Sequence, residues 1–80
     1  MFLNVTVLTP KGVVFEGKAG SVILPGEQGV FNVLPFHKRL LSRLVSGTLF
    51  IDDQSLPIRR GIVKINQNKV TVIIERSDEP

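Results

Sequence analysis

Few side chains in this sequence of 80 residues could carry out acid–base or nucleophilic chemistry. The only histidine is His37, and a histidine base would need a hydroxyl or thiol nucleophile beside it. No serine lies in a nucleophile-elbow motif, and cysteine does not occur, which excludes thiolate nucleophiles, disulfides and cysteine-based metal sites. We therefore expect His37 to be a structural residue that packs or hydrogen-bonds.

The carboxylates are equally unpromising as catalysts. Asp52 and Asp53 are adjacent, so on a strand they would face opposite ways, and their polar surroundings predict a solvated turn. Glu27 lies in a loop between Gly26 and Gly29, where glycine permits positive φ. A phosphate-binding loop would open a helix and usually carry a lysine, and neither signal is present. The sequence predicts no active site, no cofactor and no metal; the alternative for this loop is that it displays Glu27 to a partner.

Composition indicates one small globular domain. The chain has a mass of 8.8 kDa, with 42% hydrophobic and 21% charged residues, and no apolar run reaches the roughly 18 residues of a membrane helix. The N-terminus lacks the pattern of a secretory signal. The net charge is +3 and the isoelectric point is about 9.8, but the ten basic residues occur singly or in pairs. Two alternatives stay open: a small basic β-barrel that binds nucleic acid, and a small enzyme or ligand-carrier barrel.

The elements that must carry these residues are predicted to be strands. Leu3, Val5 and Val7 alternate with polar residues, which is the period of a half-buried strand. Further short apolar runs rich in β-branched residues are separated by proline, glycine and asparagine turns. These runs cover residues 13–15, 21–24, 30–34, 47–51, 56–58, 62–65 and 70–74. The pattern predicts a single all-β domain, either a β-sandwich or a small barrel.

Residues 36–45 do not fit the strand pattern. Leu40, Leu41 and Leu44 have a spacing that a short amphipathic helix would also show, and the segment is bounded by Pro35 and Gly47. Such a helix is too short to be stable without tertiary support. We expect an irregular or single-turn crossover that anchors itself through its leucines.

The stretch Gly29–Leu41 resembles the Gly-x-Leu-Gly-x-x-Pro-x-His-x-x-Leu-Leu segment of the epsilon subunit of rotary F-type ATP synthases. Other segments resemble that family in the same order along the chain, so that the similarity covers residues 2 to 75. They are the first strand 3–7, the Phe-x-Gly turn at 15–17, the step at 46–49 and the closing strands 61–65 and 69–72. Three departures are clear: Asn32 replaces a glycine, Lys38-Arg39 replaces Ala-Pro, and Arg59-Arg60 replaces a more neutral sequence.

The resemblance implies a two-layer antiparallel β-sandwich, or flattened barrel, of about ten short strands. It also implies a non-catalytic rotor subunit of the central stalk, which binds the gamma subunit and the ring of c subunits and couples proton translocation to ATP synthesis. Such a subunit lies at the membrane surface, on the cytoplasmic face of a bacterial inner membrane or the equivalent organelle face, and has no nucleic-acid partner. The implied c-ring contacts are Gly26, Glu27, Gln28, Gly29 and Val30, and the implied gamma contacts are Pro35, His37, Leu40 and Leu41.

The family commonly adds a C-terminal helical hairpin that can restrain ATP hydrolysis and, in some members, binds ATP. We expect residues 1–80 to form one domain in which residues 76–80 are a polar tail. The segment 75–80 contains no apolar residue that could start an amphipathic helix. The expectation is a coupling subunit without an inhibitory latch that does not bind ATP.

Overall fold

The computed structural model describes residues 1–36 and 38–77, which form eight strands and no helix. The strands are β1 (Leu3–Thr9), β2 (Gly12–Ala19), β3 (Val22–Gly26), β4 (Gly29–Val33), β5 (Leu40–Leu44), β6 (Gly47–Ile51), β7 (Gln54–Asn66) and β8 (Lys69–Arg76). The all-β prediction is confirmed. Within the described ranges, no helix is long and apolar enough to cross a membrane.

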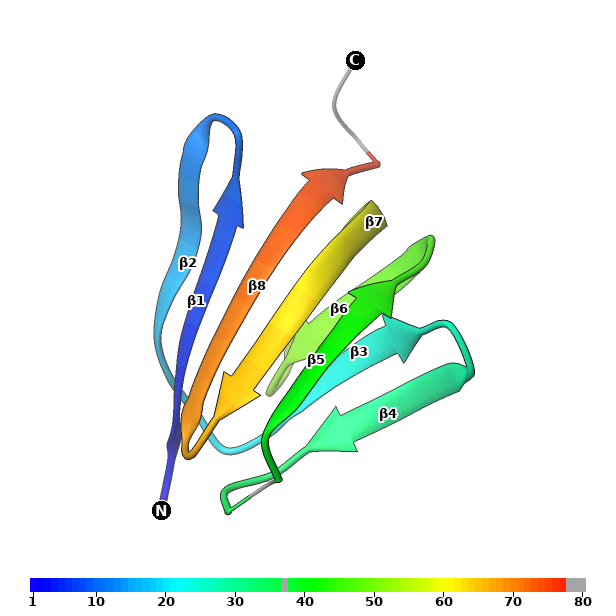
Figure 1. Cartoon of the computed structure of the whole chain (residues 1–80). Helices are drawn as coiled ribbons and strands as arrows, with labels where there is room; N and C mark the ends of the chain where they lie inside the picture. The colour runs from blue at the N-terminus through cyan, green and yellow to red at the C-terminus, as the bar shows by residue number, and fades with distance from the viewer. Residues whose placement is uncertain (37, 78–80) are drawn as a thin grey trace.

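The strands form one sheet in the order β2-β1-β8-β7-β5-β3-β4, and β6 pairs with both β3 and β7 (Figure 1). Because β6 joins strands from the two halves of this order, the sheet closes over itself around an enclosed core. One pair departs from the expected antiparallel pattern: β1 and β8, from opposite ends of the chain, run parallel from Asn4↔Lys69 to Leu8↔Ile73. The backbone N–H of Asn4 also donates to the carbonyl of Asn68 at 2.7 Å, which fixes the start of this pair.

The core is entirely aliphatic in the described part of the chain. The alternation of β1 is confirmed, because Leu3, Val5 and Val7 are buried. The other buried hydrophobic residues are Ala19, Val22, Leu24, Val33, Leu44, Leu49, Ile51, Ile58, Val63, Ile65, Val70, Val72 and Ile74. No polar or charged residue among those described is buried, so the core contains no desolvated group that would need a partner.

The prediction of an irregular crossover at residues 36–45 is wrong over its second half. Leu40–Leu44 is strand β5, paired antiparallel with β7 from Leu40↔Ile65 to Leu44↔Gly61. A helix this short cannot satisfy its own backbone groups, whereas pairing with β7 satisfies them and still buries Leu44. Phe36, which has a φ of 70°, turns the chain before β5, and its N–H donates to the side-chain oxygen of Asn68 at 2.8 Å.

The described residues form eight strands, where the resemblance implies about ten, and β7 is one continuous strand. The apolar runs 56–58 and 62–65, which suggest two strands, belong to one strand of 13 residues. The polar residues between them contain a β-bulge at Arg59, where the register with β8 shifts between Ile58 and Arg60. Beside this bulge, β8 includes Arg76, which pairs with Ile58 and was expected in the polar tail. Residues 78–80 of that tail lie outside the described residues.

The aspartates at the β6–β7 turn differ in role. Both Asp52 and Asp53 are exposed, as expected of a turn. However, the Asp52 carboxylate accepts hydrogen bonds from the backbone N–H of Gly20 at 3.0 Å and of Ser21 at 3.1 Å. The Asp52 N–H in turn donates to the Ser21 carbonyl at 3.1 Å. Asp52 therefore ties the β2–β3 connection to the β6–β7 turn, which the prediction of a merely solvated turn did not include.

Candidate docking site

The loop that contains Glu27 is the tight turn of the β3–β4 hairpin. Gly26 pairs with Gly29, so Glu27 and Gln28 form the tip and are exposed. Gly29 has a φ of 123°, and a Cβ added at Gly26 would lie 2.8 Å from the ring of Phe31. These two glycines allow the hairpin to turn sharply, and Val30, 73% exposed, follows at the start of β4.

The structure brings together candidate residues that the sequence assigns to two different partners. The c-ring candidates 26–30 line a cleft with Leu40, Leu41 and Ser42 of β5. Leu40 is half-buried and packs against the core, whereas Leu41 is 72% exposed. Pro35 is half-buried outside this cleft, beyond the end of β4, and His37 lies outside the described residues.

A row of aliphatic side chains crosses the outer face of the sheet formed by β2, β1, β8 and β7. Val13 pairs with Leu8, Leu8 with Ile73, and Ile73 with Ile62. Directly opposed side chains in a sheet are close neighbours, so these four residues form one continuous strip, which we call the outer apolar row. Ile62 is 48% and Ile73 is 53% exposed. This row offers a partner an apolar surface that the domain itself does not cover.

Leu41 extends the outer apolar row onto β5. It pairs with Lys64, while Ile62 pairs with Arg43, so Leu41 lies diagonally across from Ile62 on the same face. The sequence analysis missed this surface. The signal for this surface is that apolar residues follow one another at 62–63 and 72–74 instead of alternating with polar residues. Strands that are apolar on both faces are typically covered on both.

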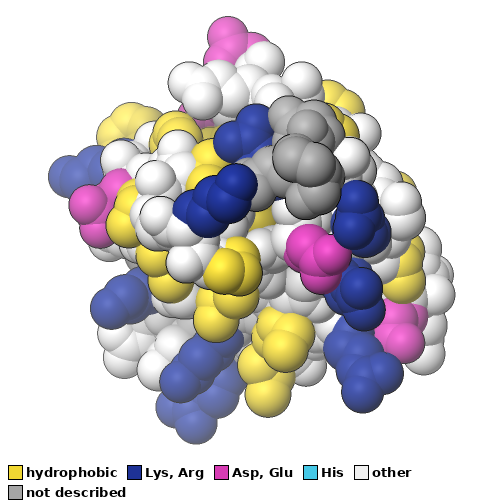
Figure 2. Space-filling model, turned by 90° about the horizontal axis from the view of Figure 1, so that it is seen from above, with side chains coloured by type: hydrophobic (Ala, Val, Ile, Leu, Met, Phe, Trp, Pro, Cys, Tyr) yellow, Lys and Arg dark blue, Asp and Glu magenta, His cyan; other side chains and the backbone are white. Residues whose placement is uncertain are grey.

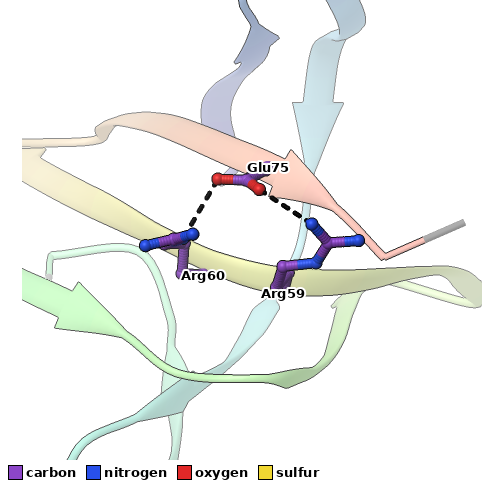
Figure 3. A network of polar contacts seen from close by, with 3 residues as sticks. All are labelled: Arg59, Arg60 and Glu75. Carbon is purple, nitrogen blue, oxygen red and sulfur yellow. Dashed lines mark hydrogen bonds and ion pairs between the residues drawn. The ribbon is translucent and has the colours of Figure 1, made fainter. Parts of the chain in front are cut away.

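Two consecutive arginines hold the same carboxylate near the C-terminal end of β8 (Figure 3). Arg59 Nη1 lies 3.1 Å from Glu75 Oε1, and Arg60 Nε lies 3.0 Å from Glu75 Oε2. Neighbouring residues of a regular strand point to opposite faces, and therefore could not both reach Glu75. The bulge at Arg59 inserts one extra residue into β7 and turns both side chains to the same side.

Gly61, next to the bulge, allows β7 and β8 to approach closely. A Cβ added at Gly61 would lie 2.6 Å from the carbonyl oxygen of Ile73 and 3.0 Å from a methyl group of Ile74. The bulge at Arg59 and the adjacent Gly61 therefore position both the two arginines and this end of the outer apolar row. The sequence shows Arg59-Arg60 as a departure from the family pattern, but it does not predict that both pair with Glu75. The bulge that allows this has no sequence signature beyond the following glycine.

A shallow groove runs beside this ion pair, and we call it the arginine groove. Its walls include Arg43, Arg59, Arg60, Ile62, Ile73 and Glu75. Seen from above the strand ends, hydrophobic side chains lie between lysine and arginine side chains on this end of the molecule (Figure 2). Residues 1–36 and 38–77 contain no group of three or more histidine, cysteine, aspartate or glutamate residues that could hold a metal ion. What the surface offers is apolar contact and charge, which suit binding.

Comparison with known proteins assigns this small β-domain to a family of ATP synthase subunits. A family model described as the beta-sandwich domain of the ATP synthase delta/epsilon chain matches residues 2–79. The chain belongs to this family, which confirms the resemblance seen in the sequence. It is 40% identical to the ATP synthase epsilon chain of Sulfurimonas denitrificans and 38% identical to that of Nitratiruptor sp., with 91% of this chain and 60% of each relative covered. Epsilon chains are a non-catalytic subunit of the complex, in agreement with the expectation that the chain is not an enzyme. The chain spans 60% of the length of these relatives.

Solved structures share the fold at low sequence identity. One is the central stalk and c-ring of the mitochondrial ATP synthase of Tetrahymena thermophila, with a TM-score of 0.77 at 13% identity, covering 91% of this chain and 63% of the matched one. Another is the OSCP/F1/c-ring assembly of the Euglena gracilis mitochondrial enzyme, with a TM-score of 0.84 at 15% identity, covering 91% and 50%. At these identities the likeness establishes a common fold.

Proposed function

We propose that the chain is a rotor subunit of the central stalk of an F-type ATP synthase, which binds the gamma subunit and the c ring and couples proton translocation to ATP synthesis. Membership of the delta/epsilon family supports this function over the nucleic-acid and enzyme alternatives. The subunit would be peripheral to the membrane, held on the cytoplasmic face of a bacterial inner membrane, or the equivalent organelle face, through its partners.

The observation that carries the proposal is the outer apolar row. Ile62 and Ile73 are about half exposed on the sheet. Along β7 and β8 they are flanked on the same face by Arg60, Lys64, Thr71 and Glu75. Contiguous exposed apolar surface on a small soluble domain marks an interaction site, and the centres of protein interfaces are apolar with a polar rim. We assign this face to gamma, together with Leu41, which extends the row.

The remaining gamma candidates contribute differently in this proposal. Leu40 packs against the core and holds β5 in place, so its role is to position Leu41. Pro35 and His37 keep their proposed roles near gamma from the family resemblance. The β3–β4 turn, with Glu27 at its tip and Val30 beside it, is assigned to the c ring because it projects a charge and an exposed aliphatic side chain from a tight hairpin.

Co-purification tests this function. The tagged chain, expressed with the gamma and c subunits of the same organism, should retain both subunits through purification in mild detergent. An Ile62→Glu, Ile73→Glu double variant should lose gamma, because two carboxylates would be desolvated at the apolar centre of the contact. A control variant that adds one carboxylate at an exposed position of β6, Phe50→Glu, should retain it. Retention of gamma by the double variant, or failure of the unaltered chain to bind either subunit, would contradict the proposal.

A further inference from the structure

The ion pair at the β7 bulge leaves hydrogen-bonding capacity unused. Each guanidinium has five N–H donors, and the contacts to Glu75 engage Nη1 of Arg59 and Nε of Arg60. Two arginines against one carboxylate also leave a net positive charge at this point. The Arg60 side chain is 70% exposed, so its remaining donors face solvent.

Arg43 adds a second positive charge to the same groove. It pairs with Ile62 across β5 and β7, and is exposed on the same face as Arg60. Within residues 1–36 and 38–77, Arg43 has no ion-pair partner. Glu27 is the other acidic residue that lines the groove. Three arginines against two carboxylates therefore give the groove an excess of positive charge.

The sides of the groove are aliphatic and continuous with the outer apolar row. Ile62 and Ile73 belong to both, and Val45 adds a further exposed aliphatic side chain. A ligand that fits must therefore bring a negative charge together with apolar surface. A polypeptide segment with a carboxylate between aliphatic residues meets both demands, whereas a free inorganic anion would leave the apolar walls uncovered.

We propose that the arginine groove binds a segment of the gamma subunit that carries an aspartate or glutamate flanked by aliphatic residues. This inference rests on the proposed function, because it takes gamma to cover the outer apolar row. Arg43 lies on β5, the strand that also carries Leu40 and Leu41, so an occupant that covers the row at Ile62 reaches Arg43 without leaving the face. The carboxylate of this gamma segment accepts hydrogen bonds from the guanidinium donors that Glu75 does not use, in the planar geometry that arginine offers.

The groove determines how gamma is oriented and how fast it associates, while the apolar row supplies the buried area. Charges at the rim of an interface act chiefly through the association rate and its salt dependence. Removing them should therefore slow association at low ionic strength more than it accelerates dissociation.

The test measures association and dissociation rates between the immobilised chain and the purified gamma subunit of the same organism, at low and at high ionic strength. The groove variant is Arg43→Glu, which breaks no ion pair in the described structure. The matched control is Lys18→Glu, an identical change in net charge on β2, away from the groove. Circular dichroism melting checks that both variants fold.

At low ionic strength we expect Arg43→Glu to slow association by about tenfold and Lys18→Glu by less than about twofold, with the difference shrinking at high ionic strength. Equal rates for the unaltered chain and Arg43→Glu, with gamma still bound, would overturn the groove assignment and leave the proposed function standing. No binding of gamma by the unaltered chain would overturn both. Equal slowing by the two variants would show that only the net charge of the chain matters, which overturns the inference. Binding of duplex DNA that depends on Arg43, without binding of gamma, would assign the groove to nucleic acid and would also overturn it.

Discussion

Ile62 and Ile73 face each other across β7 and β8 on the outside of the sheet, where half of each side chain is open to solvent. Their neighbours in sequence on β7 and β8, Val63, Val72 and Ile74, are buried on the inside. The two central strands are therefore apolar on both faces, although the domain itself covers only one. The apolar residues on the uncovered outer face of β7 and β8 are what one expects of strands that a partner covers.

The exposed pair can be altered with little effect on folding. Replacing Ile73 with glutamate should change the free energy of unfolding by no more than about 0.5 kcal/mol, because surface substitutions away from the core are usually small. The same change at the buried neighbour Val72 should be severely destabilising, since it places a charge in an aliphatic core. Urea unfolding followed by circular dichroism measures both. A large loss of stability in Ile73→Glu would show that this side chain supports the fold itself.

Asp52 should be worth more to stability than its exposure suggests. Asp52→Ala removes the acceptor for the Gly20 and Ser21 N–H groups, as well as a residue suited to the positive φ of 52°. We expect a loss of about 1–3 kcal/mol, the range for leaving backbone donors unpaired and for hydrogen bonds to charged groups. Asp53→Ala is the matched control and should stay within about 0.5 kcal/mol. Equal effects of the two substitutions in thermal melts would refute the specific role of Asp52.

Gly61 should not tolerate a side chain. Gly61→Ala places a Cβ 2.6 Å from the Ile73 carbonyl oxygen, so β7 and β8 must move apart at the bulge. We expect a loss of about 1–3 kcal/mol, typical of overpacking. Gly17→Ala, where the nearest atom to an added Cβ is a Phe15 ring carbon at 3.6 Å, should be nearly neutral. If Gly61→Ala melted at the temperature of the unaltered chain, the close approach of the two strands would be disproved.

Glu27 tests the proposed contact with the c ring. Glu27→Lys should leave the domain folded, because this exposed tip residue supports no element, but should weaken attachment to the c ring in a salt-dependent way. Glu16→Lys on β2 is the control of equal charge change. Reconstitution with c rings in vesicles, followed by sedimentation, gives the bound fraction. Binding that is unaffected by Glu27→Lys would remove the β3–β4 turn from the interface.

The part of the fold that could be predicted from the sequence is the part governed by local pattern. Leu3, Val5 and Val7 alternate as a strand facing the core must, and they are buried. Leu40–Leu44 could not be assigned in this way, because its leucine spacing also fits a helix and the decision lies with its distant partner β7. Tertiary pairing overrides a weak local preference in such short segments.

The docking surface was less predictable, for a similar reason. Glu27 was recognised as a turn residue from its flanking glycines, a local signal. The outer apolar row depends on the register of β1, β7 and β8, and no single segment contains it. The pairing of Arg59 and Arg60 with one carboxylate depends on a bulge, which changes the facing of a side chain without changing the composition of the strand.

The lack of cysteine in the chain makes site-specific cross-linking the most direct measurement of its docking face. A single cysteine introduced at Ile73, coupled to a photo-reactive maleimide, should cross-link to the gamma subunit on illumination of the assembled complex. The same probe at Phe50, exposed on β6 in the other layer, should give no gamma product. Cross-linking to gamma from position 50 with none from position 73 would contradict the assignment of the outer apolar row to gamma.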